Sequence, residues 1–536
     1  MTETRQNKEE LFSKLPQWLN YDQSDNMEEP MDVTITGNIP KWINGSVYRN
    51  GSGLYKIGPT TWNHVFDGFA VIQRWTFKDG KVTYQSSILD SDDYKKSAKL
   101  NRIVGMGFGK TFPDPCKTIF GRLFSKFMPA RPETVHNTAV NIVEFGDRLF
   151  ALTETPLINE VASDTLKVNG KSIMPDYVAV HLGTGHPHKL KDGTMIYFGT
   201  HCNYMQAYNF ISIPPQPVTS DSPFSGAKIV ATAPSRYKTN ISYTHSFGIT
   251  ENYFIHLEQP LTFSIPKLLM SALTSSSLSE CFITDKVASL DFMVVDPKTR
   301  TRTPINYKAA NGFIFHFINC YEDSDHIVCD TSYYPSGAEF IKSKYLEHLS
   351  KISIKNFTCN DKVYFARFVL PLHIEGAQEG QNLVTLPNTT ATAVLEKGSK
   401  TTLLITPETF EGNHMVELPQ INYDYNARKY RYFYGSAAFI QNKKQLSKFD
   451  LFEKRVLTFE VNENITPGEP IFVARPGATK EDDGVILCNL VANTPDDHSS
   501  LVVLDAETFQ EIGRATLPKE VRMSYTFHGN FTNKLI

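Results

Sequence analysis

The chain has 536 residues, with 54 lysines and arginines against 57 aspartates and glutamates, so its formal net charge is −3. This balance excludes a dedicated nucleic-acid binder of the usual basic kind, and a hydrophobic content of 41% excludes disorder for the bulk of the chain. No stretch approaches the roughly 18 unbroken apolar residues of a membrane-spanning helix. The polar N-terminus lacks the apolar core of a secretory signal, and seven cysteines without a CxxC motif are typical of a reduced, cytosolic chain.

In chain order, residues 1–25 are predicted to be a weakly ordered lead-in and residues 26–536 a single domain. Short strand patterns with turn signals then recur, some with Asp-Gly or Gly-Asp between apolar alternations, which predicts hairpins. The best examples are 45–58, 70–89, 139–155 and 194–213. The chain is therefore predicted to be all-β. Because no obvious linker separates the strands, one large closed β architecture is favoured over the three or four domains expected at roughly 150 residues each.

Few segments have the apolar spacing of an amphipathic helix. The pattern predicts one helix over 116–128 and another near 338–350. Residues 376–400 are predicted to be a loop-rich connection. Because clear internal repeats are not visible, periodicity alone does not predict a propeller.

The glycine-rich stretch GMGFGKT at 105–111 ends like a phosphate-binding P-loop. That motif needs a glycine where this chain has Val104. Nucleotide binding is therefore not predicted.

Four histidines stand in short apolar or turn contexts: GHPH, SYTHSFG, IFHFIN and TFHGN. A single such histidine is more often a hydrogen-bonded core residue than a metal ligand. Together they form a candidate metal set drawn from distant segments, namely His186, His245, His316 and His528. His64, His136 and His188 are predicted to have turn or supporting roles.

These contexts belong to a longer ordered set of motifs that covers almost the whole chain. The set comprises NGSVYRNGSGLY, HVFDGFAV, FPDPCKTIF, NTAVNIVEFGDRLFALTET, GHPH, YTHSFGIT, FHFINCYED, VELPQINY, GEPIFVARPGATKEDDGV and FHG. On these motifs the chain resembles the carotenoid cleavage oxygenase family. PDPC at 113–116 and EDDG at 481–484 resemble its animal branch, which includes β-carotene oxygenases, the retinoid isomerohydrolase and the insect carotenoid isomerooxygenases, the nearest group.

The resemblance implies a seven-bladed β-propeller with a helical and loop cap over the iron-bearing face. It implies that His186, His245, His316 and His528 bind one Fe²⁺ and form the catalytic centre. Neutral imidazole suits ferrous iron, and outer carboxylates can accept the other ring N–H and supply negative charge. By motif match, Glu154 is expected to pair with His245, Glu417 with His316 and Glu469 with His528.

The implied activity is cleavage of the central 15,15′ double bond of a carotenoid to retinal-type aldehydes, with O₂ as co-substrate and trans-to-cis isomerisation of one product half. The apolar polyene needs a tunnel, and motif matching places Phe66, Thr153, Tyr243 and Phe527 on its wall. The alternatives are retinyl ester isomerohydrolysis, off-centre cleavage and non-catalytic carotenoid binding. The motifs do not determine the preferred carotenoid, the product half that becomes cis, or the oligomeric state.

A carotenoid is dissolved in lipid, so contact with a membrane surface is expected. Residues 100–135 are predicted to face the membrane, with a basic, amphipathic helix near 116–128 as an interfacial anchor. The anchoring residues are predicted to be Cys116, Phe120, Phe124 and Phe127. A second apolar patch lies at 260–274. The expected location is the cytoplasm, peripherally on intracellular membranes, and the resemblance raises lipidation of Cys116 as an open question.

Overall fold

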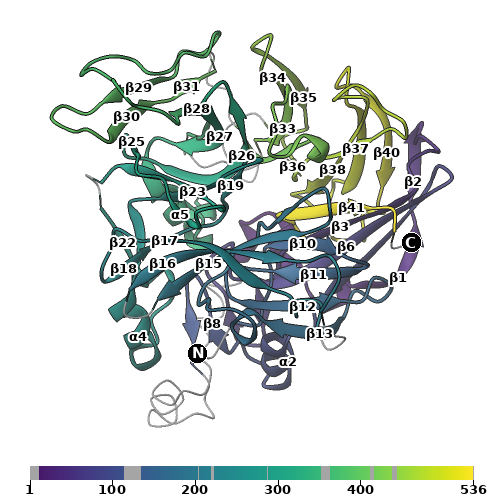
Figure 1. Cartoon of the computed structure of the whole chain (residues 1–536). Coiled ribbons are helices and arrows are strands. Elements are labelled where there is room, and N and C mark those ends of the chain that lie inside the picture. The colour runs from purple at the N-terminus through teal and green to yellow at the C-terminus, as the bar shows by residue number, and fades with distance from the viewer. Residues whose placement is uncertain are drawn as a thin grey trace.

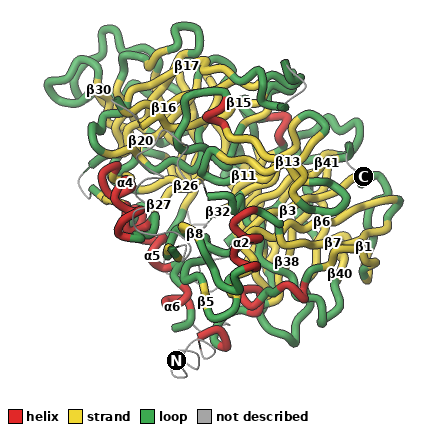
Figure 2. The backbone as a smooth tube through the Cα atoms, turned by 90° about the horizontal axis from the view of Figure 1, so that it is seen from below, coloured by secondary structure: helices red, strands yellow, loops and turns green. Residues whose placement is uncertain are grey.

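The structure, a computed structural model, describes residues 11–113, 135–202, 205–218, 222–285, 288–351, 362–410, 416–437 and 444–534. Within these ranges strands far outnumber helices, so the all-β prediction is confirmed (Figure 1). The described α-helices with at least four residues are α2 (Asp92–Lys99), α4 (Ile265–Thr274), α5 (Phe340–Ser343) and α6 (Leu346–Leu349). They lie on the face that Figure 2 shows.

The described strands form seven sheets of four or more strands, antiparallel except for the pairing of β25 with β30. The first sheet contains β1 (Met27–Asp32), β7 (Lys81–Ile88), β6 (Phe69–Lys78), β3 (Gly45–Leu54) and β41 (His528–Thr532). The second sheet contains β10 (Asn141–Phe145), β11 (Arg148–Leu152), β12 (Leu157–Val161) and β13 (Val168–Ile173). The third sheet contains β14 (His188–Lys189), β15 (Met195–Cys202), β16 (Gln206–Ile213) and β17 (Lys228–Pro234). The fourth contains β19 (Gly248–Ile249), β20 (Phe254–Glu258), β23 (Leu290–Asp296), β24 (Thr301–Arg302), β25 (Asn306–Ala309), β30 (Thr402–Thr406) and β29 (Thr392–Leu395); the fifth β26 (Phe313–Asp323), β27 (His326–Tyr334), β28 (Tyr364–Pro371) and β31 (Glu408–Thr409).

The sixth sheet contains β32 (Glu417–Ile421), β33 (Tyr432–Ser436), β34 (Gln445–Asp450) and β35 (Arg455–Glu460); the seventh β2 (Thr34–Gly37), β40 (Glu511–Thr516), β39 (Ser500–Asp505), β38 (Gly484–Ala492), β36 (Ile465–Pro467) and β37 (Ile471–Ala474). Smaller pairings join β18 (Asn240–Ser242), β21 (Leu261–Ser264) and β22 (Phe282–Thr284), β4 (Lys56–Ile57) and β5 (Thr60–Thr61), and β8 (Gly105–Met106) and β9 (Thr111–Phe112).

The two ends of the chain are joined by strand pairing. The last strand, β41, pairs with β3 in the first sheet, while β2 from the N-terminal region pairs with β40 in the last sheet (Figure 1). The innermost strands also contact one another in series, from β10 through β41, β37, β32 and β26 to β19. Side chains extend this series: the Asn141 amide donates to the Gly185 carbonyl at 2.8 Å, and His188 Nε2 lies 2.9 Å from the Phe247 carbonyl. Residues from remote parts of the sequence therefore meet at one place.

Local sequence explains the hairpins. Asp79 and Gly80 both have positive φ, 51° and 80°, as the central residues of a two-residue turn of the kind that Asp-Gly favours. The predicted hairpin over 70–89 is thus β6–β7. The predicted hairpins over 139–155 and 194–213 are β10–β11 and β15–β16.

The lead-in and the second predicted helix differ from expectation. In residues 11–25, Leu15, Trp18 and Tyr21 are buried in the largest core cluster, because an apolar side chain recurs there every three or four residues among polar neighbours. The helix near 338–350 is two short helices, α5 and α6, since Tyr345 between them is extended and bridges to His64. The connection at 376–400 is loop except for the four-residue strand β29.

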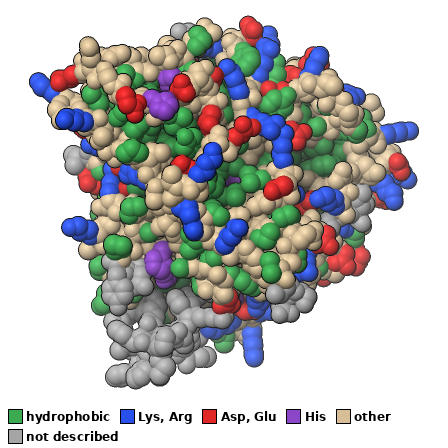
Figure 3. All heavy atoms as spheres, viewed as in Figure 1, with side chains coloured by type: hydrophobic (Ala, Val, Ile, Leu, Met, Phe, Trp, Pro, Cys, Tyr) green, Lys and Arg blue, Asp and Glu red, His purple; other side chains and the backbone are tan. Residues whose placement is uncertain are grey.

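The surface agrees with the balanced composition. Charged side chains of both signs lie among hydrophobic ones on the face in Figure 3. In the part of the chain that the structure describes, no helix has the length and apolarity to cross a membrane.

Candidate active site

The structure brings the four predicted histidines together. His186 precedes β14, His245 lies between β18 and β19, and His316 and His528 are on β26 and β41. Their candidate ligand atoms all lie within 4.8 Å of one another, and within the described ranges they are the cluster whose geometry could hold a metal ion. His186 Nε2 is 2.8 Å from His245 Nε2, which is 3.2 Å from His316 Nε2.

Each predicted carboxylate lies against the ring nitrogen on the outer side of one histidine. Glu154 Oε1 is 2.5 Å from His245 Nδ1, Glu417 Oε2 is 2.5 Å from His316 Nδ1, and Glu469 Oε1 is 2.8 Å from His528 Nδ1. These are the pairings that the resemblance implied. A carboxylate in this position accepts the Nδ1–H and leaves the Nε2 lone pair facing the centre of the cluster.

The carboxylates are themselves held by hydrogen bonds that the motifs did not predict. The Tyr243 hydroxyl donates to Glu154 at 2.5 Å, the Tyr334 hydroxyl to Glu417 at 2.8 Å, and the Gln420 amide to Glu469 at 2.7 Å. Leu418, with a φ of 50°, donates its N–H to Glu417 at 2.8 Å. Gln420 belongs to the VELPQINY motif, which was the available signal for it, whereas none of the matched motifs contains Tyr334.

Burial favours the neutral form of three of the four imidazoles. It lowers the pKa of His186 well below its ordinary value, with a further contribution from the neighbouring histidines, and it lowers the pKa of His528. It also lowers the pKa of His245 to about 4, although Glu154 opposes this shift. Burial alone would raise the pKa of Glu417 and Glu469, but their histidine partners outweigh it, so both pKa values are lowered. His186, His245 and His528 are therefore neutral donors, and Glu417 and Glu469 are ionised beside them.

This donor set fits a divalent metal ion. With Nδ1–H committed to a carboxylate, His245 and His316 direct unprotonated Nε2 atoms at each other across 3.2 Å, a contact that is repulsive unless a cation lies between them. Imidazole nitrogen is a good ligand for iron, copper and zinc. The buried carboxylates supply the negative charge that a cation requires in a low-dielectric interior.

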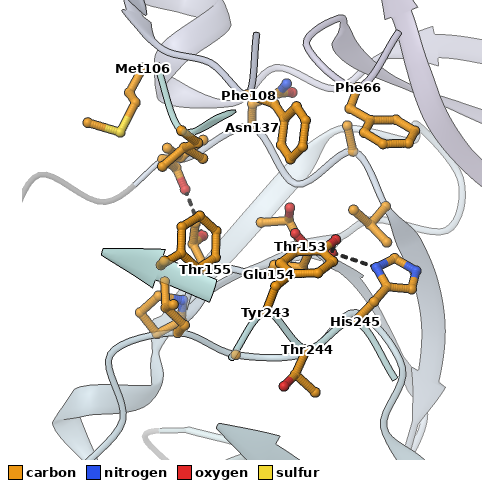
Figure 4. A pocket seen from close by; sticks show the side chains of 18 of the residues that line it. Phe66, Met106, Phe108, Asn137, Thr153, Glu154, Thr155, Tyr243, Thr244 and His245 are labelled. Atoms are coloured by element: carbon orange, nitrogen blue, oxygen red, sulfur yellow. Dashed lines mark hydrogen bonds and ion pairs between the residues drawn. The ribbon is translucent and has the colours of Figure 1, made fainter. Parts of the chain in front are cut away.

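The cluster opens onto a cavity of about 760 Å³ that is mostly apolar. His245, His316 and His528 are part of its wall, and all four predicted tunnel residues, Phe66, Thr153, Tyr243 and Phe527, line it. Figure 4 shows Phe66, Thr153, Tyr243 and His245 at this wall. The Phe66 ring packs edge-on against Phe527, with centroids 5.7 Å apart. The volume and lining suit a drug-sized or larger apolar molecule.

The glycine-rich stretch at 105–111 forms part of this wall. Met106 and Phe108 line the cavity (Figure 4). The Gly109 N–H donates to both carboxyl oxygens of the buried Asp67, at 3.1 and 3.3 Å. A Cβ on Gly109 would come within 2.5 Å of His64 Cβ. The glycine there serves close packing against the HVFDG segment.

Asp67 should make stability depend on pH. Burial raises the pKa of its carboxyl to about 7, although backbone N–H donors oppose the shift. This pKa lies above the value of about 4 for an aspartate in the unfolded chain. The protonated Asp67 carboxyl therefore contributes stability that is fully present below about pH 4 and is lost as the pH rises to about 7. Asparagine does not titrate, so we expect the Tm of Asp67→Asn relative to that of the wild type to increase between about pH 4 and about pH 7. Thermal denaturation at several pH values measures it, and a difference that does not vary with pH would contradict the assignment.

The predicted membrane-facing residues Cys116, Phe120, Phe124 and Phe127, and the helix over 116–128, lie outside the described residues. The second apolar patch is described and includes α4. Leu269 and Met270 on α4 are 68% and 51% exposed, and Leu269 also lines the cavity.

Comparison with known proteins decides the family. Residues 21–533 match the model of the RPE65, retinal pigment epithelial membrane protein, family. The chain belongs to the RPE65/carotenoid cleavage oxygenase family. It is 37% identical over 515 residues to the β,β-carotene 15,15′-dioxygenase of Gallus gallus, covering 94% of this chain and 95% of the relative. It is 35% identical over 516 residues to the mitochondrial carotenoid-cleaving dioxygenase of Mustela putorius furo, covering 94% of each.

Solved structures of the family share the fold. Cobalt-substituted Synechocystis ACO superposes with a TM-score of 0.73 at 22% identity, covering 96% of this chain and 98% of the other. An ACO/RPE65 chimera gives the same TM-score and identity over 96% and 99% of the two chains. The histidine cluster thus lies in a fold characteristic of carotenoid cleavage dioxygenases.

Proposed function

We propose that this protein is an Fe²⁺-dependent dioxygenase that cleaves the central 15,15′ double bond of a carotenoid and isomerises one product half from trans to cis. One observation carries the proposal: four clustered histidines, three of them bonded to carboxylates, open onto a largely apolar cavity. The names of the rat and chicken relatives, both 15,15′-dioxygenases, support central cleavage.

The fold that holds this site is, in the same proposal, a seven-bladed β-propeller with a helical and loop cap. The seven sheets would be the blades, and the pairing of β41 with β3 would close the ring. The four histidines, each on an inner segment of a different part of the chain, would then meet on the axis of the propeller. The seven-sheet topology and the serial contacts of the innermost strands support it.

In the reaction, His186, His245, His316 and His528 would hold the ferrous ion, which when bound activates O₂ for attack on the polyene. The chain does the rest. Glu154, Glu417 and Glu469 hold the protons at Nδ1 of their partners, and so keep Nε2 free for the metal.

The cavity wall positions the substrate and excludes water. Phe66, Tyr243 and Phe527 present aromatic surface beside the cluster, so a polyene lying along it places its double bonds near the metal position. A rigid, preformed slot of this kind contributes by orientation.

The test is product analysis. Iron-loaded protein is incubated with β-carotene or zeaxanthin under ¹⁸O₂, and the products are resolved by chromatography and mass spectrometry. We expect equal amounts of two retinal-type aldehydes, one of them cis, each with one labelled oxygen. Uncleaved carotenoid, or off-centre apocarotenals alone, would refute central cleavage. Turnover of a retinyl ester without oxygen uptake would identify an isomerohydrolase, and binding without turnover a carotenoid-binding protein.

Peripheral contact with intracellular membranes, from the cytoplasm, is part of the proposal because the substrate is dissolved in lipid. The support is the continuity between the cavity and α4, where Leu269 lines the cavity and is largely exposed together with Met270.

Liposome pelleting measures this contact. Leu269→Ser/Met270→Ser, and separately serine at Phe120, Phe124 and Phe127, should each reduce the pelleted fraction. The control Leu404→Ser removes a 45% exposed leucine on β30 and should pellet like the wild type. Undiminished pelleting of both multiple variants would end the membrane hypothesis.

A further inference from the structure

Arg49 is a buried cation directly beneath the histidine cluster. Its side chain, on β3, is 1% exposed. Nη1 donates to the Glu469 carbonyl at 2.8 Å and lies 3.7 Å from the Glu469 carboxylate, while Nε donates to the Thr526 hydroxyl at 3.3 Å. A buried guanidinium is costly unless a negative charge compensates it. Its presence here therefore calls for an explanation.

The backbone makes room for this side chain. Arg49 lies opposite Gly529 in the β3–β41 pairing, and a Cβ on Gly529 would come within 2.7 Å of Arg49 Cδ. A Cβ on Gly468 would be 3.0 Å from Arg49 Nη2. These glycines are adjacent in sequence to His528 and Glu469. Among the described residues Arg49 Nη2 nevertheless has no hydrogen-bond partner, so a full set of hydrogen bonds does not explain the residue.

The charges of the cluster give the explanation. The three carboxylates bonded to the histidines contribute −3, and Arg49 is the cation in contact with one of them, so the described shell sums to −3 + 1 = −2. Imidazole binds a metal ion in its neutral form, so the four histidines add no charge. A divalent ion makes the assembly neutral, whereas without Arg49 the shell would match a trivalent ion. In a low-dielectric interior such a difference is large.

We propose that Arg49 is a positioning residue that sets the net charge around the metal, so that the site favours ferrous over ferric iron. The inference rests on the proposed iron site. Arg49 acts through Glu469, whose backbone and carboxylate it contacts, and it does not touch the substrate cavity among the residues described.

The reduction potential of the iron-loaded protein tests this directly, because it measures the difference between ferric and ferrous binding. We expect Arg49→Gln to lower the potential, with the ratio of ferric to ferrous affinity rising about tenfold or more. It should also speed the appearance of the ferric EPR signal in air. Arg49→Lys keeps the charge and should stay near the wild type. An unchanged or higher potential in Arg49→Gln would overturn the proposal.

Arg49→Gln leaves the buried Glu469 carboxylate without its guanidinium partner, and this variant could fail to fold for that reason. A second comparison therefore uses variants in which the charge of Glu469 is removed. Glu469→Gln should raise the potential, and Arg49→Gln/Glu469→Gln, whose shell again sums to −2, should return towards the wild-type value. Equal potentials in Glu469→Gln and the double variant would also overturn the proposal.

The control is Arg367→Gln, which removes a mostly buried arginine paired with Asp330 on β27 and should leave the potential unchanged. If the wild type itself holds no iron, the proposed function fails. If it holds iron and Arg49→Gln has the wild-type potential, only this inference fails.

Discussion

His245→Ala is expected to abolish both iron binding and carotenoid cleavage. His245 Nε2 lies between those of His186 and His316, and its Nδ1 is bonded to Glu154, so its loss removes a donor and leaves a carboxylate without its partner. Iron per chain, measured by elemental analysis after loading and desalting, should fall to near zero, and turnover should fall with it.

The matched control is His326→Ala. His326 is also a buried histidine, but its Nδ1 lies 2.6 Å from the Ser324 carbonyl and its Nε2 accepts the Thr385 N–H, away from the cluster. It should retain iron even if it loses stability. Full iron occupancy with wild-type turnover in His245→Ala would remove the histidine cluster from the mechanism.

Glu469→Gln is expected to weaken ferrous binding about 10–100-fold, the usual cost of losing an outer carboxylate partner. Glu469 is 1% exposed, and its oxygens accept from His528, Gln420 and the Gly529 N–H. Because solvent does not reach this carboxylate, water cannot compensate for the loss of its charge. Glu154→Gln should cost less, because the Glu154 side chain is 26% exposed. Competition with a ferrous chelator measures both affinities.

Glu258→Gln controls for the loss of a buried carboxylate as such. Glu258 is fully buried and bonded to Tyr208 and Ser235, and it makes no described contact with the four histidines. The Glu258→Gln variant should bind ferrous iron with the affinity of the wild type. If Glu154→Gln weakens iron binding more than Glu469→Gln does, burial is not what governs the strength of these outer contacts.

The strand content, the hairpins and the candidate ligands could be predicted from the sequence because their signals are local. Alternating apolar residues around Asp79-Gly80 define β6 and β7, and each histidine sits in a recognisable short motif. Residues 11–25 show the limit of this approach. Their apolar spacing is visible, but buried side chains such as Trp18 gain partners from remote segments. The Trp18 indole, for example, donates to Asn493, which follows β38.

The sequence by itself determined the chemistry available to this protein: the imidazoles, the carboxylates and the aromatic side chains of the cavity. The tertiary structure alone decided how they combine. Arg49 and Glu469 are 420 residues apart, and no local pattern states that a guanidinium will lie beneath a carboxylate bonded to His528. Net charge at a buried site is a sum over groups brought together by strand pairing, so it exists only once β3 and β41 have paired.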